Sequence, residues 1–417
     1  MKFSFFIFIA IIYSSIVWSQ QPEITPPAYI KTIQFEGGIE FSGTPIVKLG
    51  ESIHISFDDL IGDEADYYYK ITHYNFDWTP SELSKNEYME GYDNMRITNY
   101  LNSYNTLQIY SHYWLEIPNK NTKRLKVSGN YMLEIYNNKD EIVFSRKFMI
   151  YEDIAKVTTE IKRTRDLKYI DQKQAVYFSI DGSDNLLIRN PDSNLKTLII
   201  KNNNLQESIY NLKPQYNTGN KFIYRYDKEA SFWGGNEFLA FDTKDVRGTA
   251  MNIRKIELID IYNTYLYANA SRAHEPYTYN PDINGSYVIR TLQGENNNIE
   301  AEYTWVHFNL LNPYNIPEDA AIHLYGSFNN YTIDDSTKLT YNKKTDSYQL
   351  KHLFKQGFYN YKYILVNKDG SIDHGAISGN FDKTENNYTV LAYYRDLGGR
   401  YDRIIGVGSA NSKNISN

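Results

Sequence analysis

The sequence predicts an all-β protein built from tandem immunoglobulin-like or early-set β-sandwich domains, three in number. Aromatic residues make up 16% of the 417 residues, and such side chains suit half-buried sheets better than helix interiors. Short runs alternate between apolar and polar residues with a period of two, and turn-forming residues separate these runs. No segment sustains the three- and four-residue apolar spacing of a long helix.

The length of the chain predicts several domains. A chain of 417 residues exceeds the roughly 100–200 residues that one domain usually holds. Hydrophobic residues make up 41% of the chain and charged residues 23%, which is enough apolar material for more than one core. We expect β-sandwiches at residues 20–152, 153–262 and 301–410, an irregular connector at 263–300, and a frayed polar tail at 411–417.

The first residues have the pattern of a signal peptide. Lys2 gives a positive start, and the apolar run from Phe3 to Val17 is shorter than a membrane span. A cut after Ser19 would leave modest or small side chains at the first and third positions before it. We therefore expect residues 1–19 to be removed on export, and no later segment reaches the 18 apolar residues of a transmembrane helix.

Within the first domain, alternation identifies the strands. Apolar residues recur at every second position in 53–57, which is typical of a half-buried strand. Residues 131–150 are expected to form a hairpin, because the Asn- and Asp-containing segment 137–140 suits a tight turn. The best helix candidate, 81–90, is short and follows a proline.

The same reasoning places strands in the two later domains. In the second domain we expect strands at 175–180, 197–201, 222–226 and 238–242. In the third domain we expect strands at 304–308, 322–325, 348–353, 359–366 and 388–395. Asp369 and Gly370 follow one of these strands and predict a tight hairpin turn.

Composition excludes several classes of function. The 44 Lys and Arg against 50 Asp and Glu give a formal net charge of −6, so there is no basic excess for a nucleic-acid partner. The chain has no cysteine, which excludes a thiol nucleophile, a cysteine-ligated zinc site and an iron–sulfur cluster. Neither a nucleophile elbow nor a phosphate-binding glycine loop occurs. We expect no enzymatic activity, no catalytic residues, no cofactor and no metal site.

Two sets of residues could nevertheless bind a metal ion. His307 and His323 lie at alternating strand positions, where a lone histidine more often makes a structural hydrogen bond. Five acidic residues lie within 58–66, but their spacing lacks the glycine and the terminal glutamate of a calcium-binding loop. A solvated acidic loop is the favoured interpretation, and calcium binding at 58–66 stays open.

Aromatic side chains crowd two segments of the first domain. Strand alternation cannot direct every ring around Tyr74 and Trp78 into one core. Tyr113 and Trp114 repeat the situation, and clusters of exposed aromatic residues mark interfaces. We expect these four residues to contact a partner. The alternative is that both faces of the sheet are covered by loops or by a neighbouring domain.

Many segments together resemble the type IX secretion system plug protein family of Bacteroidota. In the first domain they are 58–60, 66–71, 73–81, 87–88, 105–106, 112–113, 118–119 and 128–131, with Gly91, Ile97, Tyr100, Ser103 and Tyr110. In the C-terminal half they are 325–329, 355–361, 379–381, 384–386, 393–395 and 400–403. The resemblance runs from about Tyr29 to Gly406.

The resemblance implies a function that does not involve catalysis. It implies a non-enzymatic periplasmic protein that closes the periplasmic opening of the giant outer-membrane β-barrel translocon of the type IX system. The expected partner is therefore that barrel subunit. The expected location is the periplasm, with peripheral association to the outer membrane through the translocon and no membrane span of the chain itself.

A second hypothesis is an exported carbohydrate-binding β-sandwich protein. Residues 322–331 and 355–363 are similar to the strand pattern of starch- and glycogen-binding sandwiches. Those modules often carry tryptophan where this chain has Tyr331, which would then stack on a sugar ring. Likeness of fold does not carry function, so this remains the alternative.

Overall fold

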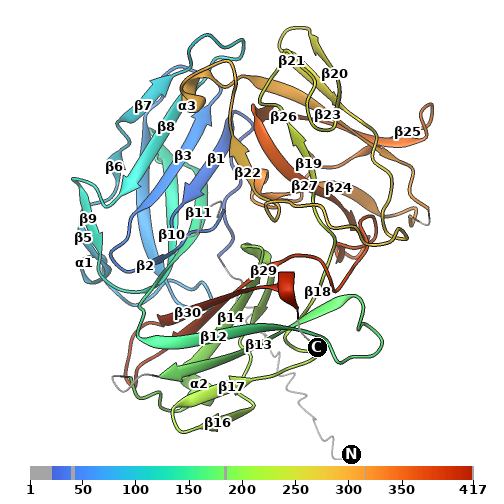
Figure 1. The fold of residues 1–417 in the computed structure, drawn as a ribbon. Coiled ribbons are helices and arrows are strands. Elements are labelled where there is room, and N and C mark those ends of the chain that lie inside the picture. The colour runs from blue at the N-terminus through green and yellow to red at the C-terminus, as the bar shows by residue number, and fades with distance from the viewer. Residues whose placement is uncertain (1–20, 39–42, 183–185, 315, 416–417) are drawn as a thin grey trace, which may run out of the picture.

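The computed structural model describes residues 21–38, 43–182, 186–314 and 316–415. In this part of the chain the strands form three two-sheet sandwiches, each around its own apolar core (Figure 1). The predicted all-β class of tandem β-sandwiches is confirmed. The predicted signal peptide, residues 1–19, lies outside the described residues.

The first unit is formed by residues 30–151. One sheet has the strand order β1 (Ile30–Glu36), β3 (Ile53–Asp59), β8 (Ser111–Ile117), β7 (Asn99–Asn102). The other has the order β2 (Ile46–Lys48), β11 (Ile142–Tyr151), β10 (Gly129–Asn137), β4 (Tyr67–Tyr74), β6 (Met95–Arg96). A short ribbon of β5 (Met89–Gly91) and β9 (Thr122–Leu125) follows α1 (Lys85–Tyr88).

Alternation explains how these strands pack. In β4, the side chains of Tyr67, Tyr69 and Ile71 are buried in the core of the first unit, while the positions between them are less buried. The expected hairpin is β10–β11, and Asp140 in its turn has a φ of 62°, which Asp tolerates better than most residues. The short helix expected in 81–90 is α1.

The second unit is discontinuous in sequence. Its first sheet has the order β12 (Ala155–Arg163), β13 (Lys173–Gly182), β17 (Lys221–Tyr224), β16 (Tyr216–Thr218), with β18 (Ser231–Trp233) also on β13. Its second sheet has the order β15 (Asn204–Tyr210), β14 (Leu195–Lys201), β29 (Asn387–Tyr394), β30 (Arg403–Asn411). The short helices α2 (Pro191–Asn194) and η2 (Ser412–Asn414) complete it.

This pairing differs from the predicted boundaries. Antiparallel pairing of β14 with β29 places Leu195 opposite Tyr394 and Lys201 opposite Tyr388. Residues 387–411 therefore belong to the second unit, not to a third domain at 301–410 (Figure 1, green with dark red strands). The physical reason is that β14 would otherwise present an unpaired edge, and a strand distant in sequence can pair with it as well as a near one.

The third unit is formed by residues 239–373. Its first sheet has the order β19 (Leu239–Asp242), β27 (Gly357–Val366), β22 (Tyr287–Ile289), with β24 (Ala321–Tyr325) and β28 (Ile372–Asp373) also on β27. Its second sheet has the order β20 (Ile253–Leu258), β21 (Tyr262–Leu266), β23 (Tyr303–Leu311), β26 (Ser347–Lys355), β25 (Thr340–Asn342). The helices α3 (Asn297–Glu300) and η1 (Ser327–Asn329) lie between strands.

The predicted connector at 263–300 is consequently part of a sandwich. It contains most of β21, which pairs with both β20 and β23, as well as β22 and α3. Turn-rich composition hid these short strands, because strand pairing rather than local sequence stabilises them.

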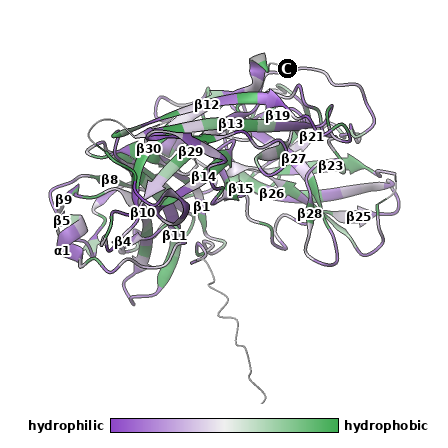
Figure 2. Cartoon of the chain, turned by 90° about the horizontal axis from the view of Figure 1, so that it is seen from below, coloured by the Kyte–Doolittle hydropathy of each residue, from purple (hydrophilic) through white to green (hydrophobic). Residues whose placement is uncertain are grey.

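The three units contact one another along three seams. In Figure 1 the first unit (blue to cyan) and the third unit (yellow to orange) lie side by side above the second unit. Figure 2 shows hydrophobic residues along strands such as β29 and β30, whereas α1 is hydrophilic.

The α-helices within the described ranges have four residues each, far fewer than the roughly 20 that a membrane crossing needs.

Candidate functional site

The seam between the first and third units is built on a buried carboxylate. Asp58 of β3 is 0% exposed, and its Oδ2 accepts hydrogen bonds from Lys355 Nζ at 2.7 Å and from Tyr303 Oη at 2.6 Å. Its Oδ1 lies 2.7 Å from His112 Nδ1. Lys355 also donates to the backbone oxygen of Asn298 at 2.6 Å. The carboxylate thus joins residues of both units through three close polar contacts.

The electrostatics of this seam favour the ionised pair. Burial alone would raise the pKa of Asp58, but the charge of Lys355 and the hydrogen bond from His112 lower it overall. Burial lowers the pKa of Lys355, and Asp58 opposes that change. A buried ion pair of this kind contributes little net stability against an apolar pair, yet removing one partner alone is costly. This ion pair therefore favours one position of the third unit relative to the first.

The seam between the first and second units is mainly apolar. Its cluster consists of Ile46, Phe76, Met149, Leu198, Ile200, Leu391, Tyr393 and Ile404. Burying one such side chain contributes roughly 1.5–3 kcal/mol. Tyr393 Oη donates to Asn130 Oδ1 at 2.8 Å across the seam, and Arg403 Nη2 pairs with Glu152 at 2.6 Å. This seam therefore combines buried apolar surface with specific polar contacts.

Several of the residues that carried the family resemblance lie at or beside this seam. His73 places its Nδ1 2.8 Å from Ser81 Oγ and its Nε2 3.1 Å from the backbone oxygen of Ser128. Burial lowers the pKa of His73 to about 4. Gly129 has a φ of 142°, and a Cβ built there would lie 2.4 Å from His73 Nε2. These motif residues have structural roles, because they pack against His73 or form hydrogen bonds with it.

A second buried charge cluster joins the second and third units. Glu207 of β15 lies 3.2 Å from Lys362 Nζ and 3.8 Å from Lys201 Nζ. Burial alone would raise the pKa of Glu207, but the charges of Lys362, His374 and Lys201 lower it overall. Burial lowers the pKa of Lys201 to about 8. Each pair of units thus shares buried polar or charged contacts.

The predicted contact residues Tyr74 and Trp78 are buried. They are 5% and 1% exposed and form a small cluster with Met132 on the outer face of the first unit's sheet. Lys147 covers the Trp78 ring, with Nζ 4.3 Å from its centroid. The structure thus gives these two rings a packing role, because other parts of the chain cover this sheet face.

Tyr113 and Trp114 point to opposite faces of β8. Tyr113 is 1% exposed, stacks on Phe57 at 5.3 Å between ring centroids, and donates to the backbone oxygen of Ala65 at 2.8 Å. Trp114 is half-buried and stacks against His112. Of the four predicted contact residues, Trp114 alone retains appreciable exposed ring surface, and the structure does not bring the four together into one patch.

The acidic segment 58–66 does not gather its carboxylates around one point. Asp58 is paired with Lys355. Asp59 accepts hydrogen bonds from Tyr67 Oη at 2.8 Å and from the backbone N–H of Ile61 at 2.9 Å. No group of three or more His, Asp or Glu side chains in the described ranges is arranged to hold a metal ion. His307 and His323 instead make hydrogen bonds to Asn and Thr side chains. The open calcium question therefore gains no support from the geometry.

Tyr331, the residue on which sugar stacking depends, is buried. Its ring is 6% exposed and lies 5.0 Å from the Tyr325 ring. A carbohydrate-binding module needs a flat, exposed ring, so this residue cannot stack on a sugar in this conformation. The structure offers nothing in favour of the carbohydrate hypothesis at this position.

An exposed apolar surface at one end of the first unit was not predicted. We call it the tip patch, and it consists of Ile61 (51% exposed), Leu101 (46%), Tyr104 (68%), Leu107 (49%) and Ile109 (58%). Gln108 Nε2 donates to the backbone oxygen of Leu60 at 3.2 Å, which holds the two contributing loops together. The backbone N–H of Leu107 donates to the Glu302 carboxylate at 2.8 Å, which anchors the loop to the third unit. Apolar residues spaced along the Asn-rich segment 101–109 were the sequence signal.

Comparison with known proteins connects this architecture to one family. Residues 30–152, which span the first unit, match the family model for the type 9 secretion system plug protein 1st domain. The crystal structure of a hypothetical protein from Parabacteroides merdae is 32% identical, aligns over 94% of this chain and 100% of its own, and has a TM-score of 0.89. No curated protein matches the chain.

Two other solved structures are much less similar. The BSP domain of a biofilm-associated protein is 7% identical over 94% of this chain and 61% of its own, with a TM-score of 0.16. The collagen adhesin of S. aureus is 9% identical over 91% of this chain and 95% of its own, with a TM-score of 0.09. Scores this low carry no structural argument.

Proposed function

Because the chain belongs to the type IX secretion system plug protein family, we propose that it is a non-enzymatic plug. It closes the periplasmic opening of the outer-membrane translocon barrel of that system. The match over residues 30–152 carries this proposal, since it covers the whole first unit. The chain acts in the periplasm and is held at the outer membrane through the barrel.

Rigidity supports this role. A protein that blocks a wide opening must resist deformation, and the three seams tie the sandwiches together through buried contacts. Asp58 with Lys355 fixes the third unit to the first, and Glu207 with Lys362 fixes the third unit to the second. The apolar cluster around Tyr393 joins the first unit to the second. Such a body presents the same surface each time it meets its partner, which lowers the entropy lost on binding.

The tip patch is the surface that we assign to barrel contact. Exposed apolar side chains held on anchored loops are typical of protein interfaces. The patch lies in the unit that matches the family, and the hydrogen bond from Leu107 to Glu302 keeps its loop in place. Trp114 remains a proposed contact, whereas Tyr74, Trp78 and Tyr113 stabilise the first unit.

Affinity purification from the native cell envelope tests the proposal. The exported wild-type chain should recover a large outer-membrane barrel protein after mild cross-linking. The double variant Leu107→Asp, Ile109→Asp should recover much less of it. Leu258→Asp, a change at a residue that is 59% exposed on the third unit, serves as the matched control and should recover as much as the wild type. Recovery of no barrel by the wild type contradicts the function, and equal recovery by all variants contradicts the contact surface alone.

A further inference from the structure

Arg146 occupies a position in β11 that normally takes an apolar side chain. Phe144 and Phe148, two residues away on either side, belong to the core of the first unit, and alternation puts Arg146 on the same face. On the neighbouring strand it lies opposite Leu133, another core residue. Arg146 is only 6% exposed. Buried charges are normally paired, so a guanidinium in this register needs an explanation.

The guanidinium forms no ion pair within 4.0 Å in the described part of the chain, although the charge of Glu23 acts on it from farther away. No carboxylate there lies within ion-pair distance of it, and its one hydrogen bond runs from Nη1 to the backbone oxygen of Ser145, at 2.8 Å. Its Cζ lies 5.4 Å from the centroid of the Phe144 ring. An arginine offers five N–H donors in a planar fork, so most of its binding capacity is unused.

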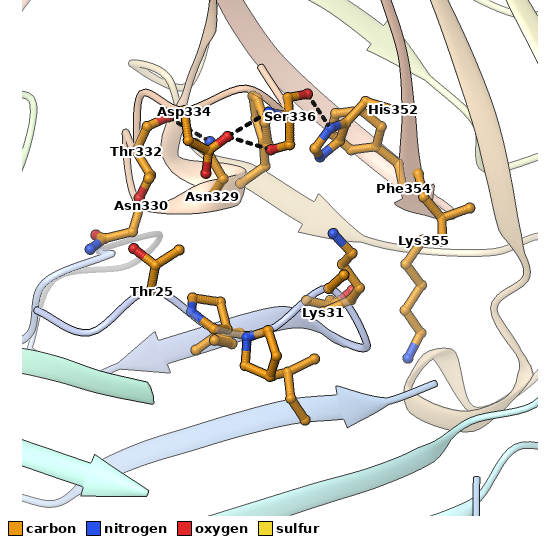
Figure 3. Close-up of a pocket in the computed structure, with 18 of the residues that line it drawn as sticks. Thr25, Lys31, Asn329, Asn330, Thr332, Asp334, Ser336, His352, Phe354 and Lys355 are labelled. Atoms are coloured by element: carbon orange, nitrogen blue, oxygen red, sulfur yellow. Dashed lines mark hydrogen bonds between the residues drawn. The ribbon is translucent and has the colours of Figure 1, made fainter. Parts of the chain in front are cut away.

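Arg146 lies where three neighbouring cavities meet. It lines cavities of about 260 and 80 Å³ between the first unit and the third unit, and one of about 390 Å³ that Leu205 and Gln206 of the second unit also line. Figure 3 shows the first of these, with Thr25 and Lys31 on one wall and Asn330, Thr332 and Asp334 on the opposite wall. Pockets for drug-sized ligands measure roughly 300–1,000 Å³, so the first cavity, at about 260 Å³, suits a smaller molecule.

A second cation faces the same space. Lys31 of β1 is half-buried and forms no ion pair within 4.0 Å of any described carboxylate, although the charge of Asp334 acts on it from farther away. Lys355 also lines the cavity, but its ammonium group is committed to Asp58. Two positive groups from two different strands, Arg146 and Lys31, are therefore available to a ligand.

The acidic residues around the cavities are already engaged. Glu23 accepts hydrogen bonds from the backbone N–H of Lys147 at 2.5 Å and from the Asn330 side chain. Asp334 Oδ1 accepts from Ser336 N at 2.8 Å and from Ser336 Oγ at 2.6 Å. These carboxylates fix the N-terminal segment and the loop of the third unit, and neither one reaches Arg146 within 4.0 Å.

We propose that this cavity binds a small organic oxyanion, a carboxylate or a phosphate, whose charged group pairs with Arg146. The guanidinium fork matches the two oxygens of either group, and Lys31 supplies a second positive charge. Such a ligand would give Arg146 a directly paired counter-charge, which Glu23 does not provide. It would also touch both the first and the third unit, and so would strengthen the seam between them.

Calorimetric titration of the exported full chain at constant ionic strength tests this site. The probes are succinate for the carboxylate class and inorganic phosphate for the phosphate class, with chloride as the background anion. At least one probe should bind saturably, with a Kd below about 10 mM, and should raise the Tm. Arg146→Gln should weaken that binding at least tenfold, and Arg225→Gln, at an exposed arginine of the second unit, should leave it unchanged.

Two results overturn the proposal. One is that neither probe binds the wild type with a Kd below about 10 mM. The other is that Arg146→Gln binds within tenfold of the wild type. If Arg146→Gln does not fold, Lys31→Gln decides, because that residue is half-buried and unpaired. Weaker binding by Lys31→Gln supports the site, and unchanged binding overturns it.

Discussion

Asp58 of the first unit and Lys355 of the third unit form a buried ion pair, with 2.7 Å between Oδ2 and Nζ. The two residues are 297 positions apart in sequence, and their side chains are 0% and 1% exposed. Tyr303 and His112 complete the shell of the carboxylate. This contact helps to fix how the two sandwiches sit against each other, and removing either partner would leave the other charge buried without its counter-charge.

Removing one partner of this pair should be strongly destabilising. Asp58→Ala leaves the Lys355 ammonium buried without a counter-charge, at an expected cost of about 3–5 kcal/mol in the free energy of unfolding. Asp319→Ala is the control, since Asp319 and Lys368 are 66% and 79% exposed, and it should cost about 0–1 kcal/mol. Urea unfolding followed by tryptophan fluorescence measures both. Equal losses for the two variants would contradict the role of the seam.

Asp282 should make stability fall as the pH rises. Burial raises the pKa of Asp282 to about 7 in the folded chain, whereas an unfolded aspartate titrates near 3.9. Between about pH 4 and 7 the folded state therefore holds a proton that the unfolded state has lost, and its stability declines through this window.

Asp282→Asn removes that proton linkage. The variant should gain stability relative to the wild type as the pH rises from 4 to 8, on the order of 2 kcal/mol once partial exposure is allowed for. Thermal unfolding at a series of pH values measures the difference between the two proteins, which cancels contributions from other groups. A constant difference across this range would show that Asp282 ionises normally.

Sequence reasoning was most successful where the fold depends on local pattern. The two-residue period found β3, β10, β11, β23 and β27, because half-buried strands must alternate. β11 ends at Tyr151 and β12 begins at Ala155, on either side of the position where a boundary was expected.

Sequence reasoning failed where the fold depends on partners distant in sequence. The pairing of β14 with β29 leaves no local signal, so the second unit could not be recognised as discontinuous. The same limit applies to the aromatic residues. Trp78 is covered by Lys147 rather than by a partner protein, which is the covered-face alternative that alternation alone could not decide. The tip patch was missed because its apolar residues lie largely in loops.

Tyr393→Phe should weaken the seam between the first and second units. The change removes the hydroxyl that donates to Asn130 Oδ1 at 2.8 Å and leaves that buried oxygen without this donor. The expected cost is about 1–3 kcal/mol. Tyr348→Phe, at a half-buried residue of β26, should change stability by less than about 0.5 kcal/mol. Differential scanning calorimetry compares the two, and a neutral Tyr393→Phe would show that the hydrogen bond contributes little.

Gly129→Ala should destabilise the chain more than Gly219→Ala does. A Cβ at Gly129 would lie 2.4 Å from His73 Nε2, and the residue has a φ of 142°. Gly219 has a φ of 61°, in the left-handed region that other residues also adopt, with nothing within 4 Å of the added atom, so Gly219→Ala carries a backbone cost of about 1 kcal/mol and no steric clash. The Gly129 variant should lose about 1–3 kcal/mol beyond that. Equal melting temperatures for both variants would contradict the close packing at His73.

The proposed plug role is tested most directly by the conductance of the purified type IX translocon barrel in a planar lipid bilayer. Adding the exported chain to the periplasmic side should reduce the open-pore conductance towards zero as its concentration rises. The variant Leu107→Asp, Ile109→Asp should leave the pore open at the same concentrations. A pore that conducts equally well with and without saturating wild-type chain would contradict the proposed function.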